Sequence, residues 1–235
     1  MRTVSLAIPT YNRFDFLTEC ISYVIDDPRI GEIVVSDDAS TDGSYEKLQT
    51  LFKSHPKVKL FRNGSNVDCY RNKALAVERA TLPWVILFDD DNVLPKDYLD
   101  TLYGKIWEVT WQEDTVYCPD YAEPYFDYTA FGGSLVNRSN VAEFMKKPHF
   151  STALNTANYF FHREHWLRVW DSLVEPNTAD SIYQAYRLLS GGCQLMFVRG
   201  LRYFHRVHEK SHYKLNVHRT GNFASKVEEM LRQLR

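Results

Sequence analysis

The chain has 235 residues, of which 44% are hydrophobic and 25% are charged, and its formal net charge is −2. These totals are typical of a globular protein with a sizeable core and one large domain. The near-zero charge argues against a general nucleic-acid binder, which needs a basic excess, so we expect no nucleic-acid partner.

The cysteines and the first residues bear on the cellular compartment. Four cysteines, Cys20, Cys69, Cys118 and Cys193, lie far apart and lack the spacing of a metal or redox motif. Reduced thiols predict a cytoplasmic protein, and the first residues read as a strand, not a signal peptide. No apolar run approaches the roughly 20 residues of a membrane span. Peripheral contact with the inner face of a membrane stays open.

Apolar runs and helical segments alternate through the first half of the chain. Short strands are predicted at 4–8, 32–36, 58–61 and 84–88, and helices at 14–24, 43–52 and 69–80. This alternation predicts right-handed crossovers and a parallel sheet with both faces covered. The predicted fold class is therefore α/β, with a Rossmann-like, mostly parallel central sheet flanked by helices.

The second half is less regular. Strands are predicted at 116–118, 155–161, 194–198 and 202–204, and helices at 164–170, 180–189 and 223–234. The sequence shows no repeat and no clear linker. We therefore expect a single domain over 1–235, with a first half of about 1–110, a smaller irregular half of about 111–220 and a C-terminal helix at 221–235.

Three carboxylates, Asp89, Asp90 and Asp91, follow the apolar strand at 84–88. Adjacent carboxylates repel each other, and a hard divalent cation would offset that repulsion because it prefers oxygen ligands. Such a cation usually completes its shell with water and substrate phosphates. The run therefore predicts metal-assisted phosphate-ester chemistry, although an acidic turn before the next helix would give the same letters.

Polar clusters also follow the first and second predicted strands. Residues 9–13 follow the first strand and residues 37–43 follow the second. In a parallel sheet the carboxyl ends of the strands lie on one edge, so the three clusters are expected to form one site. Tyr11 offers a ring face to a base, and Asp38 offers an acceptor for a ring N–H. Arg71 and Lys73, on the third predicted helix, are candidates for phosphate contacts.

The segments 4–13, 33–44, 71–74 and 87–95 together resemble the family 2 glycosyltransferases, which have the nucleotide-sugar-binding GT-A fold. Two later segments extend the similarity. Residues 179–191 resemble the acidic catalytic motif of the family, and residues 203–211, with Arg206, His208 and Ser211, resemble its basic motif. The resemblance implies a nucleotide-sugar-binding first half and an acceptor-binding second half.

The resemblance also implies a reaction, namely the metal-dependent, inverting transfer of a sugar from a UDP-sugar. The acceptor would be a hydroxyl of a glycan or of a lipid-linked saccharide. The cofactor would be Mn²⁺ or Mg²⁺. Asp180 would be the general base that deprotonates the acceptor hydroxyl.

Binding residues follow from the resemblance by position. Thr10, Tyr11 and Asp38 would hold the nucleobase, with Pro9 and Arg13 shaping its pocket. The remaining donor contacts would come from Arg71, Asp89, Asp90 and Arg206. The metal would be held by Asp89, Asp91 and His208, and His205 is the alternative to His208.

One departure from the family pattern stands beside the base. The family usually has Glu before it, whereas this chain has Ala179. If Asp180 is not the base, Glu175 and Asp171 are the substitutes. The departure also keeps open a nucleotide-sugar-binding protein without catalysis. A nucleotidyltransferase acting on a sugar phosphate is a further alternative, but it would require a Gly-rich loop that residues 9–13 lack.

Overall fold

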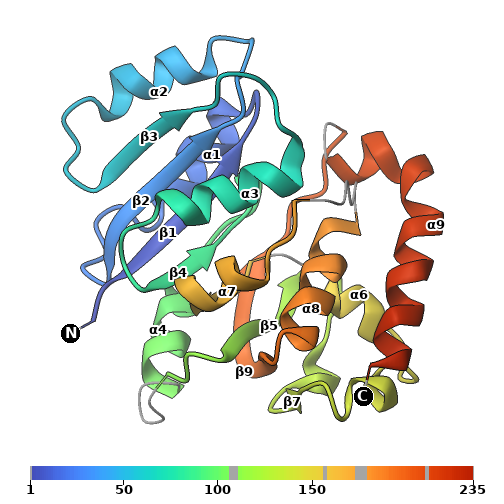
Figure 1. Cartoon of the computed structure of the whole chain (residues 1–235). Helices are drawn as coiled ribbons and strands as arrows, with labels where there is room; N and C mark the ends of the chain where they lie inside the picture. Colours follow the sequence, from blue (N-terminus) through green and yellow to red (C-terminus); the bar gives the residue numbers. More distant parts are fainter. Residues whose placement is uncertain (1, 106–110, 156–157, 173–178, 210–211, 235) are drawn as a thin grey trace.

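The computed structural model describes residues 2–105, 111–155, 158–172, 179–209 and 212–234. Its core is a nine-stranded sheet with the order β3-β2-β1-β4-β8-β5-β9-β7, and β6 pairs with β5. Figure 1 shows the first half of the chain around one side of this sheet and the second half around the other. One sheet therefore runs through both halves.

The first half is a regular alternation of strands and helices. Its elements are β1 (Val4–Thr10), α1 (Phe14–Ser22), β2 (Ile30–Asp37), α2 (Ser44–Phe52), β3 (Val58–Arg62), α3 (Asp68–Arg79) and β4 (Trp84–Leu87). β1 pairs in parallel with β2 and with β4, and β2 pairs in parallel with β3. The α/β prediction, with a mostly parallel sheet in the first half, is confirmed.

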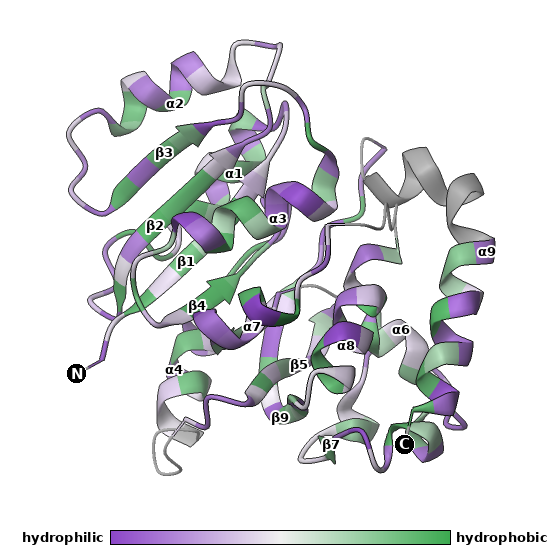
Figure 2. Cartoon of the chain, viewed as in Figure 1, coloured by the Kyte–Doolittle hydropathy of each residue, from purple (hydrophilic) through white to green (hydrophobic). Residues whose placement is uncertain are grey.

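Alternate strand residues feed two separate hydrophobic clusters, one on each face of the sheet. In β1, Ala7 packs with α3 residues on one face, whereas Leu6 and Ile8 pack with α1 residues on the other. This alternation follows from the two-residue period of a strand. Because both faces are covered, the strands are apolar along nearly their whole length, as the hydropathy colouring of β2 and β4 in Figure 2 shows.

The second half consists of shorter and more varied elements. They are α4 (Lys96–Lys105), β5 (Thr115–Glu123), β6 (Phe126–Asp127), a 3₁₀ helix (Thr129–Phe131), β7 (Leu135–Val136), α5 (Val141–Phe144), α6 (Phe150–Leu154), β8 (Phe160–His162), α7 (Arg163–Val169), α8 (Asp180–Ser190), β9 (Gln194–Phe204) and α9 (His212–Gln233). β8 pairs antiparallel with β4, and β5 pairs in parallel with β9. These pairings continue the sheet across the two halves.

Several predicted boundaries in the second half are wrong. The strand predicted at 155–161 begins only at Phe160, since α6 extends to Leu154 and Asn158 has a left-handed φ of 86°. The strands predicted at 194–198 and 202–204 are one strand, β9, which passes through Gly200 at a φ of 75° and resumes its pairing with β5. The C-terminal helix begins at His212, earlier than predicted.

The helices of the described residues were compared with the length and hydropathy that a membrane span requires. Among them, no helix combines sufficient length with sufficient hydrophobicity to cross a bilayer. α9 has hydrophobic and hydrophilic residues in alternating bands, as Figure 2 shows for its described part.

Candidate active site

The structure brings the carboxyl ends of β1, β2 and β4 together, as the sequence predicted for a parallel sheet. The backbone N–H of Asp38 donates to the carbonyl of Thr10 at 2.9 Å. The Thr10 hydroxyl in turn donates to Asp90 at 2.6 Å. Thr10, a predicted nucleobase contact, therefore lies between the Asp38 loop and the Asp89–Asp91 run, and its hydroxyl bonds to that run.

The Asp89–Asp91 run is neutralised by basic side chains from both ends of the chain. Arg13 donates to Asp90 at 2.7 Å and to Asp91 at 2.9 Å. His208 Nε2 lies 2.9 Å from Asp91 Oδ2. Both carboxylates are almost fully buried, and a buried carboxylate requires such charged partners. Residues nearly 200 positions apart in the sequence therefore meet at Asp91.

The surroundings of Asp90 and Asp91 shift the pKa values of these two acids in opposite directions. Burial alone would raise the pKa of Asp91, but the hydrogen bond from His208 and the charge of Arg13 lower it below its ordinary value. For Asp90, burial outweighs Arg13, and repulsion from Asp91 adds to it, so the pKa rises to about 6. Asp91 is thus the acid best suited to remain ionised.

Asp89 faces a different partner from its two neighbours. Its carboxylate lies 3.6 Å from the ammonium of Lys73, which also lies 2.7 Å from Asp180 Oδ2. Burial alone would lower the pKa of Lys73, but Asp180 and Asp89 raise it well above its ordinary value. The charged ammonium therefore connects the acid run of the first half to the candidate base of the second half.

Asp180 stands in the first turn of α8, where the partial positive charge of the helix N-terminus favours a carboxylate. Cys69 Sγ lies 3.8 Å from Asp180 Oδ2. Burial raises the pKa of this thiol, which keeps it protonated. Ala179, where the family has Glu, is 1% exposed and belongs to the hydrophobic core. At this position, therefore, an apolar side chain packs in the core in place of the acid of the family pattern.

The proposed base pocket is partly preformed. Asp38 is buried, and its Oδ1 accepts hydrogen bonds from Asn63 Nδ2 at 2.8 Å and from the Val67 N–H at 2.9 Å. Burial raises the pKa of Asp38. Tyr11 is 42% exposed, so its ring is accessible to a stacking partner, whereas Pro9 is buried in β1.

The two predicted arginine contacts differ in their surroundings. Arg71 pairs with Glu78 at 3.0 Å, and its guanidinium lies 4.7 Å from the centre of the Trp170 ring. Lys73, not Arg71, is the α3 cation that meets the acid run. Arg206 pairs with Glu19 at 2.9 Å, and its buried Nη1 has no hydrogen-bond partner among the described residues. That nitrogen is therefore available to a ligand.

Among the alternatives, the described residues place His205 and Asp171 differently. Aspartates 89 and 91 act on the pKa of His205, but burial is the larger effect and lowers it. His205 Nδ1 is buried and unpaired within the part of the chain that the structure describes. Asp171 is 3.4 Å from Arg187, so it has an ion pair of its own. Glu175 and Ser211 lie outside the described residues.

Two asparagines that the sequence did not single out hold the site in place. Asn158 Oδ1 accepts the Asp89 N–H at 2.8 Å, and Asn158 is buried with a left-handed φ of 86°. Asn72 bonds Ser36 of β2 through both ends of its amide, at 2.6 and 2.8 Å. Only the left-handed preference of asparagine hints at Asn158 in the sequence. The contact of Asn158 with Asp89 is visible only in the folded structure.

Comparison with known proteins agrees with this geometry. The family model described as glycosyl transferase family 2 matches residues 5–109, which contain the Asp38 loop and the Asp89–Asp91 run. This part of the chain is therefore similar to glycosyl transferase family 2. The chain spans 31–39% of the length of the first curated relatives it matches.

One curated relative is the GalNAc(5)-diNAcBac-PP-undecaprenol beta-1,3-glucosyltransferase of Campylobacter jejuni, which is 33% identical over 107 residues, 45% of this chain and 35% of the relative. Two solved structures share the fold. S. aureus TarS 1-349 in complex with UDP-GlcNAc has a TM-score of 0.70 and 16% identity over 89% of this chain and 60% of that one. The mannosyltransferase PcManGT of Pyrobaculum calidifontis, in complex with GDP-Man and Mn²⁺, has a TM-score of 0.67 and 15% identity over 100% of this chain and 70% of that one. The fold of this chain is therefore GT-A.

The donor atoms at the acid run fit a hard or borderline divalent cation. Asp91 offers a carboxylate with a lowered pKa, and His208 offers an imidazole nitrogen in direct contact with it. Asp89, which is 29% exposed at its side chain, offers a third oxygen. Carboxylate ligands suit Mn²⁺ and Mg²⁺. The site therefore combines a candidate cation position with a charged lysine and a second acidic position, Asp180.

Proposed function

We propose that this protein is a metal-dependent, inverting glycosyltransferase that moves a sugar from a UDP-sugar to a hydroxyl of a glycan or lipid-linked saccharide. Asp180 is the general base. Asp91, Asp89 and His208 hold Mn²⁺ or Mg²⁺. The donor nucleotide occupies the pocket of Pro9, Thr10, Tyr11, Arg13 and Asp38.

One observation carries this proposal. Lys73 contacts Asp180 at 2.7 Å and Asp89 at 3.6 Å, so the acid from the second half and the acid run from the first half share one ammonium. A sugar transfer requires a leaving-group site and a base on opposite sides of one anomeric carbon. The short distances from Lys73 to Asp180 and Asp89 support a site in which one substrate meets both groups.

The residues divide the chemistry between them. When bound, the cation supplies Lewis acidity to the diphosphate leaving group. Arg206, whose buried Nη1 lacks a protein partner among the described residues, adds a hydrogen bond to the same oxygens. Asp180 takes the proton of the acceptor hydroxyl as that oxygen forms its bond to the anomeric carbon. The ammonium of Lys73 orients the carboxylate of Asp180 and offsets the charge of Asp89.

The choice of uracil rests on Asp38. Two protein donors already fix its Oδ1, and the carboxylate retains acceptor capacity for a ring N–H. Uracil presents such an N–H, and Tyr11 offers a ring face for stacking. The TarS complex contains UDP-GlcNAc and the PcManGT complex contains GDP-Man with Mn²⁺. Both support a nucleotide-sugar donor, and the first supports UDP.

The acceptor class rests on the relatives. The Campylobacter jejuni relative is named for an undecaprenol-linked saccharide acceptor. The same class of acceptor would bring this chain to the inner face of a membrane by peripheral contact, with a cytoplasmic location. A lipid-linked oligosaccharide is therefore the first acceptor class to test.

The test is a thermal-shift screen of UDP-, GDP- and dTDP-sugars with and without Mn²⁺, followed by nucleotide-release assays with saccharide acceptors. A ligand that binds only the native state raises the unfolding midpoint. We expect a UDP-sugar to raise it only with Mn²⁺, and UDP to be released faster with an acceptor. A shift without any release would support a binding protein that lacks catalysis. Pyrophosphate release from a nucleotide triphosphate and a sugar phosphate would support a nucleotidyltransferase.

A further inference from the structure

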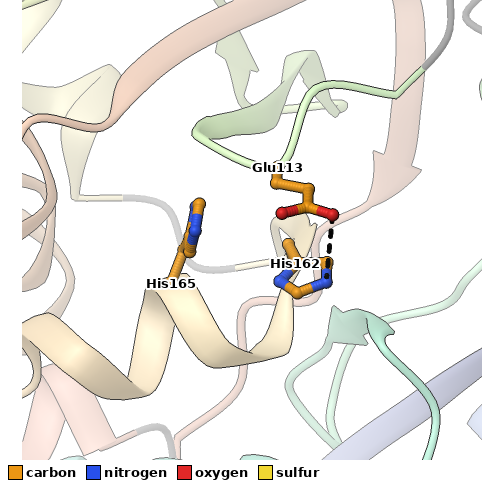
Figure 3. Close-up of side chains that lie close together, drawn as sticks. All are labelled: Glu113, His162 and His165. Atoms are coloured by element: carbon orange, nitrogen blue, oxygen red, sulfur yellow. Dashed lines mark ion pairs between the residues drawn. The ribbon is translucent and has the colours of Figure 1, made fainter.

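Two histidines and a glutamate converge at the opposite edge of the sheet from the donor site. Figure 3 shows His162 and His165 at the beginning of α7, with Glu113 reaching them from the loop before β5. One ligand atom of each residue lies within 4.8 Å of the others. His162 Nε2 is 3.9 Å from Glu113 Oε1. We propose that Glu113, His162 and His165 bind a zinc-type divalent cation, separate from the sugar-donor site.

The three backbones are held in place by structure around them. His162 ends β8 and pairs with Trp84 of β4, and the following N–H, of Arg163, donates to the Pro83 carbonyl at 2.8 Å. The turn that carries Glu113 is held by a bond from the Thr115 N–H to the Gln112 carbonyl at 3.1 Å. His162 is the extended residue immediately before α7, and His165 lies in the first turn of that helix.

Unsatisfied nitrogens give independent support. The Nδ1 atoms of His162 and His165 are both buried, and neither has a hydrogen-bond partner among the described residues. A buried polar atom without a partner costs free energy, so it usually has a role. Each of the two imidazole rings therefore has one buried nitrogen that bonds to none of the described protein groups.

The ligand chemistry selects the cation. Two imidazoles and one carboxylate are a common three-ligand set for zinc, with water in the fourth position. A tetrahedral site with ligand distances of about 2.0–2.1 Å requires ligand atoms about 3.3 Å apart. Glu113 is 66% exposed at its side chain, so it is free to rotate inward.

The cluster lies far from the proposed transfer chemistry. His162 pairs with Trp84 at the start of β4, whereas Asp89 follows the end of that strand. Five extended residues span about 16 Å. A cation here would therefore act on structure. It would link the loop before β5 to the junction of β8 and α7, at the seam between the two halves.

The test is a titration of the metal-stripped full chain with Zn²⁺, measured by competition with a chelating dye and by the unfolding midpoint. The Asp91→Asn background removes the donor-site ligand. We expect one Zn²⁺ to bind in that background and to raise the midpoint. Loss of a direct ligand in Glu113→Gln or His165→Gln should weaken binding by more than about tenfold.

His55→Gln is the matched control. His55 Nδ1 is also buried and unpaired among the described residues, yet His55 belongs to no such cluster of described residues. Its substitution should leave Zn²⁺ affinity unchanged. Because Glu113 is exposed, its glutamine variant is expected to fold, which circular dichroism checks. The proposal is wrong if the Asp91→Asn chain binds no Zn²⁺, or if Glu113→Gln and His165→Gln bind it as well as His55→Gln does.

Discussion

At the scale of single residues, three buried acids of the site each contact at least one basic side chain. Asp91 has Arg13 and His208, Asp90 has Arg13, and Asp180 has Lys73. A buried carboxylate without such a partner costs several kcal/mol. The cations therefore determine which acids are charged, and Lys73 is the one that joins the two ends of the proposed reaction.

Lys73→Met tests that role. The variant keeps the aliphatic stem but leaves Asp180 and Asp89 without their ammonium, so we expect the free energy of unfolding to fall by about 3–5 kcal/mol. Sugar transfer should fall about 100-fold or more, as for other charged groups that act at a reacting centre. Chemical denaturation and nucleotide release measure the two effects.

The control for Lys73→Met is Lys53→Met on the exposed surface, which should change stability by less than about 0.5 kcal/mol. A double variant with Asp180→Asn removes the unpaired carboxylate, and it should be less destabilised than the sum of the single variants. Strict additivity would show that the two side chains do not interact.

The pKa of Asp90, about 6, predicts a pH dependence of donor binding. Below that pH the carboxyl is protonated and loses its charge toward Arg13 and the cation. Mn²⁺-dependent UDP-sugar affinity should therefore fall from pH 7.5 to pH 5, measured by calorimetry. Because this pKa is raised above the ordinary 3.8, the same proton stabilises the fold as pH falls through 6. The affinity loss should therefore occur without unfolding, and Asp90→Asn should remove the step at pH 6.

At the scale of elements, Glu32 on β2 connects three strands and a loop. Its carboxylate accepts hydrogen bonds from Ser5 of β1 at 2.6 Å and from the Thr81 hydroxyl at 2.8 Å, and it pairs with Lys59 of β3. These donors outweigh burial and lower the pKa of Glu32 to about 2. The buried acid therefore fixes the amino-terminal part of the parallel sheet, on the side away from the proposed chemistry.

Glu32→Gln should lower the free energy of unfolding by about 2–3 kcal/mol, because a charged acceptor becomes neutral among its donors. Sugar transfer should be retained. In the wild type, the stabilisation is present above the unfolded pKa of about 4.5 and is lost as pH falls toward 2. Glu46→Gln is the control, since Glu46 pairs with Arg62 at an exposed position and its substitution should change stability much less than Glu32→Gln does. Equal effects in both variants would contradict this account.

An element can be predicted from the sequence when its own residues determine its structure. The first-half strands are buried on both faces, so their apolar runs are nearly continuous and easy to recognise. In the second half, β8 has only three residues and follows a left-handed Asn158. Gly200 interrupts the apolar pattern of β9 without ending the strand. Pairing with distant strands determines the bounds of β8 and β9, and the sequence around each strand does not show that pairing.

The same distinction holds for the site residues. Adjacent carboxylates and strand ends pointed to Asp38 and Asp89–Asp91 in the sequence, because topology alone brings such ends together. The contact of His208 with Asp91 spans 117 positions and followed only from family resemblance. Lys73 was expected at a phosphate, whereas the structure places it between two carboxylates. The direction in which Lys73 points from α3 determines these contacts, and the sequence alone does not give that direction.

At the scale of the whole molecule, α3 connects the two halves at the site. Asn72 on this helix bonds Ser36 of β2, and Lys73, the next residue, reaches Asp180 of α8. Tyr70 donates to Gln184 of α8 at 3.0 Å. The helix thus fixes the distance between the proposed donor pocket and the proposed base. The central claim is that these two regions form one catalytic site.

Asp180→Asn tests that claim most directly, with donor binding and transfer measured on the same preparation. Calorimetry with Mn²⁺ and the UDP-sugar should give an affinity within about threefold of the wild type, because Asp180 contacts no proposed donor group. Nucleotide release with an acceptor should fall by about 100-fold or more, since general base catalysis contributes roughly 10²–10⁴. Transfer at the wild-type rate by this variant would contradict the account.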